Sequence, residues 1–145
     1  QSMLRLVDGR DNFKEYNDFI IESWARCVQW KISTDHYRSL INNPNYDFTV
    51  NAQDWTRYSR TSDGEISPYT PVFIDLIDNT NQRTASNPNR CIDNVSGYTL
   101  SELQSIMVQS TNLSELRQTL KANLRHGATA AQIDQLLDNY IVLGF

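Results

Sequence analysis

The stretch Asp18-Phe19-Ile20-Ile21-Glu22-Ser23-Trp24-Ala25-Arg26-Cys27-Val28-Gln29-Trp30 decides the fold. It lies in Asn12–Ile41, the longest segment with helical periodicity that contains neither Gly nor Pro. Apolar residues recur there every three or four positions, which predicts an amphipathic helix whose N-cap is the carboxylate of Asp11. The expected buried face comprises Phe13, Tyr16, Ile20, Ile21, Trp24, Cys27, Val28 and Lys31.

Outward from this stretch, residues 33–35 are expected to end or kink the helix, because Ser, Thr and Asp favour caps over helix interiors. Pro44 then prevents further helix. Residues 42–69 are expected to form a long irregular insertion. Within it, the alternation of Tyr46, Phe48 and Val50 fits a short strand and an extended loop with buried anchors equally well.

The second half of the chain carries clear helix-start signals. Thr70 and Pro71 predict a short helix with Thr70 as N-cap, and the apolar run that follows predicts a central position for it. Three further helices each begin with a capping pair, and His126-Gly127 is expected to end the second of them. The pairs are Thr99 with Glu102, Asn112 with Glu115, and Thr129 with Gln132. The chain is therefore predicted to be all-α, a single multi-helix domain over residues 4–145.

Composition limits the classes of function. The net charge is −4 and the 13 basic residues are scattered, whereas a nucleic-acid face needs clustered Lys and Arg. No apolar run is long enough to span a bilayer. The opening residues 1–3 (Gln1-Ser2-Met3) read as the remnant of a cleavable tag, so the native segment is expected to begin near Leu4 as a piece of a longer protein.

The residue types that most often carry chemistry are few. Cys27 lies on the predicted apolar face and Cys91 in a polar loop, and sequence leaves open whether they pair or remain free thiols. His36 and His126 are expected to be surface or capping residues, since no His-Glu-x-x-His pattern is present. The Asp and Asn residues of 78–94 do not follow the calcium-loop spacing of an EF-hand.

Glu22 is the one acidic residue set among Trp and aliphatic neighbours. It lies about 200° round the helix from Trp24, because each residue turns the helix by about 100°. From the residues alone, the expected partner of Glu22 is therefore Arg26, in a solvated i, i+4 ion pair.

A resemblance adds a second interpretation of Glu22. The run Ile21-Glu22-Ser23-Trp24-Ala25, followed by Gln29-Trp30, resembles the glutamate helix of gluzincin-type zinc metallopeptidases. Segments 71–78 and 94–100 resemble the tail of secreted or lipoprotein peptidases of this kind. In that family the Glu is the third zinc ligand, and the two His ligands come from an upstream His-Glu-x-x-His helix.

The resemblance implies that this chain is the C-terminal helical part of a secreted zinc-peptidase-like protein, inert by itself. Glu22 would bind zinc in the full-length protein, the N-terminal part of the same parent would be its partner, and the location would be extracytoplasmic. The alternative is a helical protein-interaction or structural module without enzymatic activity, which the capped helices favour in the absence of any recognisable site.

Overall fold

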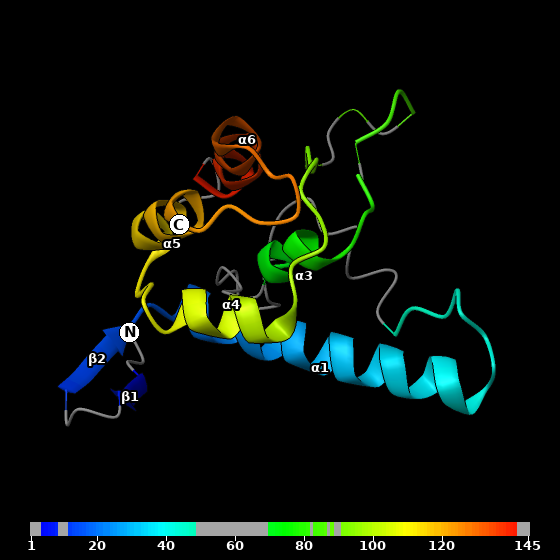
Figure 1. Cartoon of the computed structure of the whole chain (residues 1–145), viewed down its shortest axis with the longest axis horizontal. Coiled ribbons are helices and arrows are strands. Elements are labelled where there is room, and N and C mark those ends of the chain that lie inside the picture. Colours follow the sequence, from blue (N-terminus) through cyan, green and yellow to red (C-terminus); the bar gives the residue numbers. More distant parts are fainter. Residues whose placement is uncertain are drawn as a thin grey trace, which may run out of the picture.

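The fold is helical, as predicted, and a short β-hairpin precedes the helices (Figure 1). A computed structural model describes residues 4–8, 12–48, 70–81, 83–86, 88 and 91–141. Strands β1 (Leu4–Asp8) and β2 (Asn12–Tyr16) pair antiparallel, with Leu4 opposite Tyr16. The helices are α1 (Asp18–Leu40), α3 (Val72–Ile77), α4 (Leu100–Met107), α5 (Leu113–Ala122) and α6 (Ala130–Ile141).

Helix α1 begins six residues later than the sequence predicts. Asn17 is its N-cap, and the Asn17 side chain accepts the backbone N–H of Phe19 at 2.9 Å. The Asn17 backbone N–H donates to the carbonyl of Thr111, at 2.8 Å, and so ties the start of α1 to the start of α5. The predicted cap at Asp11 and the predicted helical turn over residues 12–16 are therefore wrong, because residues 12–16 form β2.

The buried face of α1 is also rotated from the predicted one. From Ile20 onward its buried residues step by three or four, and two of them carry hydroxyls; the buried residues are Phe19, Ile20, Ser23, Cys27, Trp30 and Thr34. Trp24 is only half-buried and packs edge-on against Phe73 of α3, with ring centroids 5.5 Å apart. The hydroxyl of Ser23 is satisfied by Thr70, whose Oγ1 lies 2.8 Å from Ser23 Oγ.

No break occurs at residues 33–35. The Thr34 hydroxyl is buried and accepts the backbone N–H of Phe48 at 3.1 Å, so this side chain fastens a later segment instead of capping a helix. Arg38 Nε donates to the Tyr46 carbonyl at 2.6 Å and holds the same segment. Residues 42–48 are irregular, as predicted for the start of the insertion, and residues 49–69 lie outside the described part.

Helix α3 is short and central, as predicted. Residues 70–76 are all buried between α1 and the later helices. The helix starts one residue later than expected: Pro71 occupies the N-cap position, and the Thr70 hydroxyl accepts the N–H of Val72 at 3.4 Å.

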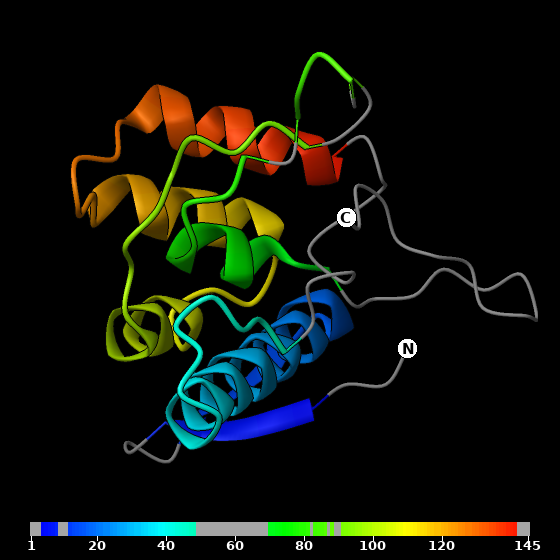
Figure 2. The ribbon, with the colours of Figure 1, turned by 90° about the vertical axis from the view of Figure 1, so that its right-hand side faces the viewer.

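Helices α4, α5 and α6 follow the predicted caps. Thr99 and Glu102 form a reciprocal capping box, Asn112 caps α5, and Thr129 exchanges hydrogen bonds with Gln132. Helix α5 ends at Ala122, before the expected stop at His126-Gly127, and this leaves Leu124 exposed. Helices α5 and α6 lie side by side and antiparallel (Figure 2).

Two ionic contacts and one irregular segment complete the packing. Arg117 on α5 lies 2.7 Å from both Asp134 and Asp138 on α6.

Residues 91–98, here called the strap, run from α6 to α3. The Asn139 amide bonds both the N–H and the carbonyl of Ile92, and the N–H groups of Gly97 and Tyr98 donate to the carbonyls at the end of α3.

The helices and the strap share one hydrophobic core, to which α1, α3, α4, α5 and α6 all contribute. Among the described helices, none combines the length and the hydrophobicity that crossing a bilayer requires.

Candidate functional site

Glu22 is half-buried on α1. The expected ion pair with Arg26 is absent from the described residues, because the Arg26 guanidinium donates instead to Gln29, at 2.9 Å. The described part of the chain also brings no three His, Cys, Asp or Glu side chains together in a way that fits a metal ion. The assignment of Glu22 as a zinc ligand thus remains a prediction.

The most unusual chemistry lies between α3, α6 and the strap, where two carboxyl groups are buried. Asp75 is fully buried on α3, and Tyr140 of α6 donates its hydroxyl proton to Asp75 Oδ2 at 2.5 Å. Burial is the main cause that raises the pKa of the Tyr140 hydroxyl, and the charge of Asp75 raises it further. Tyr140 is therefore a fixed hydrogen-bond donor to Asp75.

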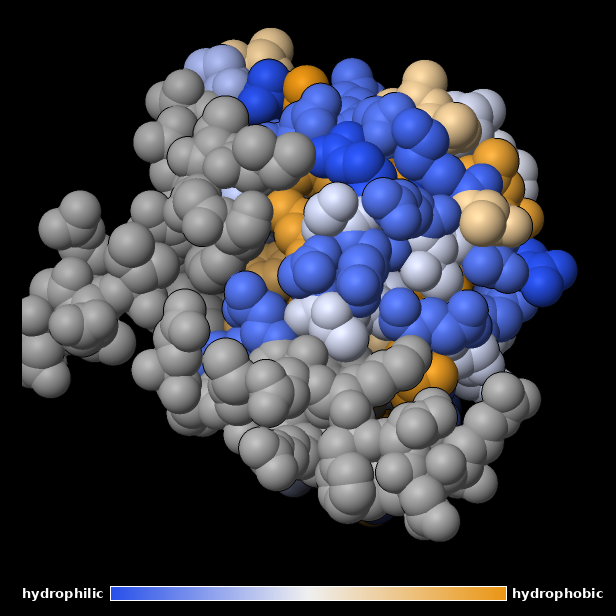
Figure 3. Space-filling view, turned by 90° about the vertical axis from the view of Figure 1, so that its left-hand side faces the viewer, coloured by the Kyte–Doolittle hydropathy of each residue, from blue (hydrophilic) through white to orange (hydrophobic). Residues whose placement is uncertain are grey.

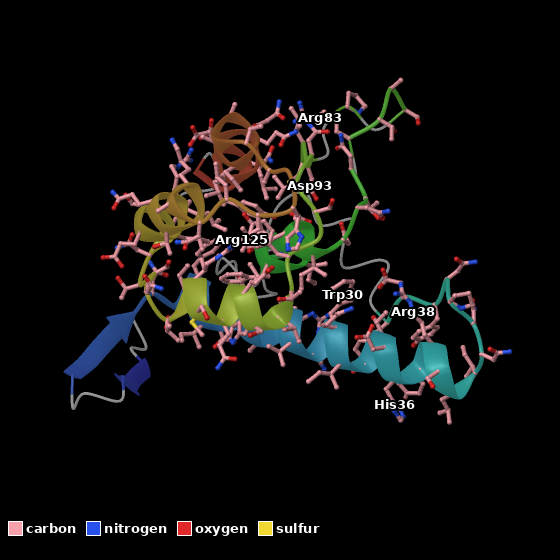
Figure 4. The ribbon with its side chains drawn as sticks, in the orientation of Figure 1. Trp30, His36, Arg38, Arg83, Asp93 and Arg125 are labelled. Carbon is pink, nitrogen blue, oxygen red and sulfur yellow. The ribbon has the colours of Figure 1, made fainter. Side chains whose placement is uncertain are left out.

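Asp93 on the strap is the second buried carboxyl group, with only 4% of its surface exposed. Its Oδ1 accepts the backbone N–H of Val95 at 3.0 Å, whereas its Oδ2 is buried and has no hydrogen-bond partner among the described residues. Burial raises the pKa of Asp93 to about 9, and the negative charge of Asp75 contributes to this increase. Figure 4 shows Asp93 between α3 and α6.

A cleft of about 340 Å³ opens beside Trp30, between α1, the end of α3 and the strap. Trp30 donates its indole N–H to Asp47 Oδ1 at 2.8 Å, and burial raises the pKa of nearby Asp78 to about 6. The cleft is lined by Trp30, Lys31, Arg38, Asp47, Ile77, Asp78, Asn79, Thr80, Ser96 and Gly97. Its walls carry charges of both signs, so no single ligand charge is favoured.

The C-terminal part of α1, together with its C-cap Ile41, exposes an apolar surface, here called the α1 tip. It consists of Ile32, His36, Tyr37, Leu40 and Ile41, all of them exposed. The Tyr37 ring packs against Tyr46 and Phe48, with centroids 5.6 and 6.4 Å away, so its position is fixed. His36 points away from the rest of the fold and Arg38 points to the other side of the helix (Figure 4).

The cysteines and histidines form no nucleophile–base pair that the described geometry supports. Cys27 and Cys91 are both buried and do not form a disulfide. Burial raises the pKa of the Cys27 thiol to about 12, which leaves no thiolate at neutral pH. Both histidines are exposed, and His126 Nε2 lies 2.8 Å from Glu102 Oε2 at the start of α4.

Sequence reasoning missed the buried carboxyl pair and the α1 tip. A signal for the first was present, since Asp75 interrupts the apolar run Val72–Ile77 and a charged residue there must be buried. No local signal marked Asp93, because the segment around it has neither helical nor strand periodicity.

Comparison of this chain with models of protein families, with curated proteins and with solved structures gave no match.

Proposed function

We propose that this chain is a non-catalytic helical interaction module that inserts the α1 tip into an apolar groove of a partner polypeptide. One observation carries this proposal. Six large apolar side chains are exposed among the described residues, and four of them fall between Ile32 and Ile41. Their exposed fractions are 60% for Ile32, 40% for Tyr37, 65% for Leu40 and 52% for Ile41.

The arrangement of these side chains supports helix-in-groove binding. Successive residues are about 100° apart round a helix, so the five residues of the α1 tip cover about one contiguous half of its circumference. The spacing of Ile32, His36 and Leu40 is i, i+4, i+8, which places the three side chains on one face of the helix, as groove binding requires. A convex surface of this kind suits a polypeptide partner better than a small molecule, which needs a concave site.

The surroundings of the α1 tip support the same proposal. Lys31 and Asp35 form an ion pair at its edge, at 3.1 Å, so an apolar centre is bordered by charge as in protein interfaces. Figure 1 shows that this end of α1 extends past α3 and α4. By contrast, the coloured residues on the opposite side of the molecule are mainly hydrophilic, with small apolar patches (Figure 3).

The chain offers a matched pair of variants for the test. The double variant Ile32→Ser/Leu40→Ser removes two anchors. The control Val108→Ser/Leu124→Ser removes the other two large apolar side chains that are exposed among the described residues. A photo-crosslinking residue at His36 of the full-length protein identifies the partner, and titration calorimetry with the purified partner gives the affinities. We expect at least a tenfold loss of affinity for the first variant and less than twofold for the second.

Equal affinities of the two double variants would contradict the proposal. So would the absence of any polypeptide crosslinked at His36 beyond those crosslinked at Ser114, an exposed position on α5. Sedimentation velocity of the chain alone shows whether the partner is a second copy, in which case Ile32→Ser/Leu40→Ser is expected to dissociate it.

A second candidate function is the zinc-peptidase role, favoured by one observation. The half-buried carboxylate of Glu22 has no hydrogen-bond or ion-pair partner among the described residues, as expected of a ligand whose metal is supplied by another part of a protein. Zinc bound there would polarise a substrate carbonyl and activate water. In the full-length protein, Glu22→Gln is expected to lower the zinc content, while Asp18→Asn, one turn earlier on the same face, leaves it unchanged. The absence of His-Glu-x-x-His upstream would exclude this role.

A further inference from the structure

The cleft beside Trp30 is lined by four charged side chains, two of which already have partners. Lys31 forms an ion pair with an aspartate one turn further along α1, at 3.1 Å. Asp47 accepts the indole N–H of Trp30 at 2.8 Å. The other two charged side chains are Arg38 of α1 and Asp78 at the end of α3. A ligand that enters the cleft therefore meets one cation and one carboxyl group that can still accept a partner.

The hydrogen bonds of Arg38 and Asp78 show which of their atoms remain available. Arg38 Nε donates to the Tyr46 carbonyl at 2.6 Å, and this is its one hydrogen bond among the described residues, so both terminal nitrogens can still donate. Asp78 Oδ1 accepts the N–H of Thr80 at 3.0 Å, whereas Oδ2 is buried without a partner in the described part of the chain. No ion pair joins Arg38 to Asp78 there, although both line the same cleft.

The remaining walls and the size of the cleft restrict the ligand. Trp30 and Ile77 contribute apolar surface to its wall. Trp30 and Arg38 lie on the same side of α1, opposite to His36 (Figure 4). The volume of about 340 Å³ lies near the lower end of the range of small-molecule sites, ~300–1,000 Å³. The cleft therefore suits a small molecule with a short carbon chain and two oppositely charged ends.

We propose that this cleft binds a small zwitterion of the amino-acid type, with its ammonium group on Asp78 and its carboxylate on Arg38. A guanidinium group can donate two parallel N–H bonds to a carboxylate, and the terminal nitrogens of Arg38 are available for them. The last torsion of an Asp side chain is broad, so rotation of the Asp78 carboxyl group can turn its unsatisfied oxygen toward the ligand. The ammonium group then supplies the donor that this oxygen lacks among the described residues.

The ionisation of Asp78 makes this binding depend on pH. Burial raises the pKa of Asp78 to about 6, a backbone N–H bond opposes the increase, and the charge of Asp47 adds to it. The other titratable groups around Asp78 are Lys31 and Arg38, both cations, and the neutral thiol of Cys27. With this pKa, about nine-tenths of Asp78 is ionised at pH 7 and about one-tenth at pH 5, so the affinity for an ammonium group should fall about tenfold.

Three probes with the same four-carbon chain test the proposal in the wild-type protein. The first, 4-aminobutyrate, carries both charges, whereas butylammonium carries only the positive charge and butyrate only the negative one. Glycine and 6-aminohexanoate extend the series, because the length of the best zwitterion measures the separation of the two charged groups. Nitrogen-15 NMR of the Trp30 indole N–H, assigned with Trp30→Phe, gives each dissociation constant.

We expect the best zwitterion to bind about tenfold more tightly than butylammonium and butyrate, because only the zwitterion contacts both charged groups. The same zwitterion should bind about tenfold more weakly at pH 5 than at pH 7. The proposal is wrong if no zwitterion shifts the indole resonance, or if butyrate or butylammonium binds as tightly as the best zwitterion.

Two variants assign the ends of the ligand. Asp78→Asn keeps an acceptor for Thr80 and removes the charge, so the best zwitterion should bind to it no more tightly than butyrate does. In Arg38→Gln the same zwitterion should bind no more tightly than butylammonium. Asp138→Asn, at an exposed acidic position on α6, is the control and should leave the affinities unchanged. An unchanged affinity of the zwitterion for Asp78→Asn would overturn the proposal, and so would an unchanged pH dependence in that variant.

Discussion

Tyr140 shows what a single hydroxyl contributes inside this protein. Its ring is buried against Phe19, with centroids 6.2 Å apart, while its hydroxyl bonds Asp75. We expect Tyr140→Phe to lower the free energy of unfolding by about 1–3 kcal/mol, because it leaves a buried acceptor without its donor. Urea denaturation at pH 7 measures this loss. Tyr98→Phe is the matched control: that hydroxyl makes two longer contacts, at 3.3 and 3.2 Å, and its removal should cost less.

The two thiols differ from reactive cysteines in their surroundings. Because burial raises the pKa of Cys27 to about 12 and Cys91 is buried as well, native protein at pH 8 should react with Ellman's reagent only as fast as it unfolds. Two equivalents should react at once in 6 M guanidinium chloride. The exposed variant Ser114→Cys provides the control for reagent activity, and rapid labelling of a native wild-type thiol would contradict the burial of both.

At the scale of the helix, the N-caps in the second half of the chain contribute measurably to the free energy of unfolding. In α4, the Thr99 hydroxyl accepts the N–H of Glu102 and the Glu102 carboxylate accepts the N–H of Thr99. The Thr99 N–H, followed by the His126 side chain, lowers the pKa of Glu102. We expect Thr99→Ala to cost about 0.5–2 kcal/mol in thermal or urea unfolding. Gln104→Ala, at an exposed position of the same helix, should cost little.

The same helices show which parts of the fold local sequence determines. Thr99, Asn112 and Thr129 each cap a helix through bonds to residues three positions along the chain, so the information is local and the prediction was confirmed. The start of α1 could not be predicted in this way, because Phe13 and Tyr16 fit helical spacing while residues 12–16 pair with β1. Pairing between strands depends on partners that periodicity does not reveal.

Tertiary contacts also explain why the sequence did not predict that α1 continues through residues 33–35. Thr34 was expected to lie where the helix ends or kinks, yet Ser23 and Thr34 are both buried within it, because Thr70 and Phe48 bond their hydroxyls. These partners lie 47 and 14 residues away. A hydroxyl next to a distant donor or acceptor behaves as a core residue, and no window of neighbouring residues contains that information.

The features of the candidate sites also divide into those that depend on tertiary contacts and those that local sequence was expected to predict. The exposure of the α1 tip depends on which elements stop short of it, and the burial of Asp93 depends on α3 and α6, so neither could be derived from spacing. The Glu22–Arg26 pair was a local prediction and was wrong, because Gln29 offers the Arg26 guanidinium an alternative acceptor one turn away. Surface ion pairs contribute less than about 1 kcal/mol, so such a competition is easily decided either way.

On the scale of the whole molecule, the shared core should make unfolding cooperative. Leu136 of α6 is fully buried in the cluster to which all five described helices contribute. We expect Leu136→Ala to lower the free energy of unfolding by about 2–5 kcal/mol through lost burial and a residual cavity. Circular dichroism and tryptophan fluorescence should report one coincident transition in the wild type. Leu124→Ala, at an exposed position, should change the stability little, and separate transitions would contradict a single core.

Helix α1 fastens both boundaries of the segment 49–69. Thr34 and Arg38 hold residues 46–48 on one side, and Ser23 accepts the N–H of Thr70 on the other. Ser23 and Thr34 are eleven positions apart on the same helix, which corresponds to about 17 Å along its axis. About five or six extended residues span that length. Because both attachment points lie on one helix, their separation stays constant, and this separation sets a lower limit on the length of any connection between them.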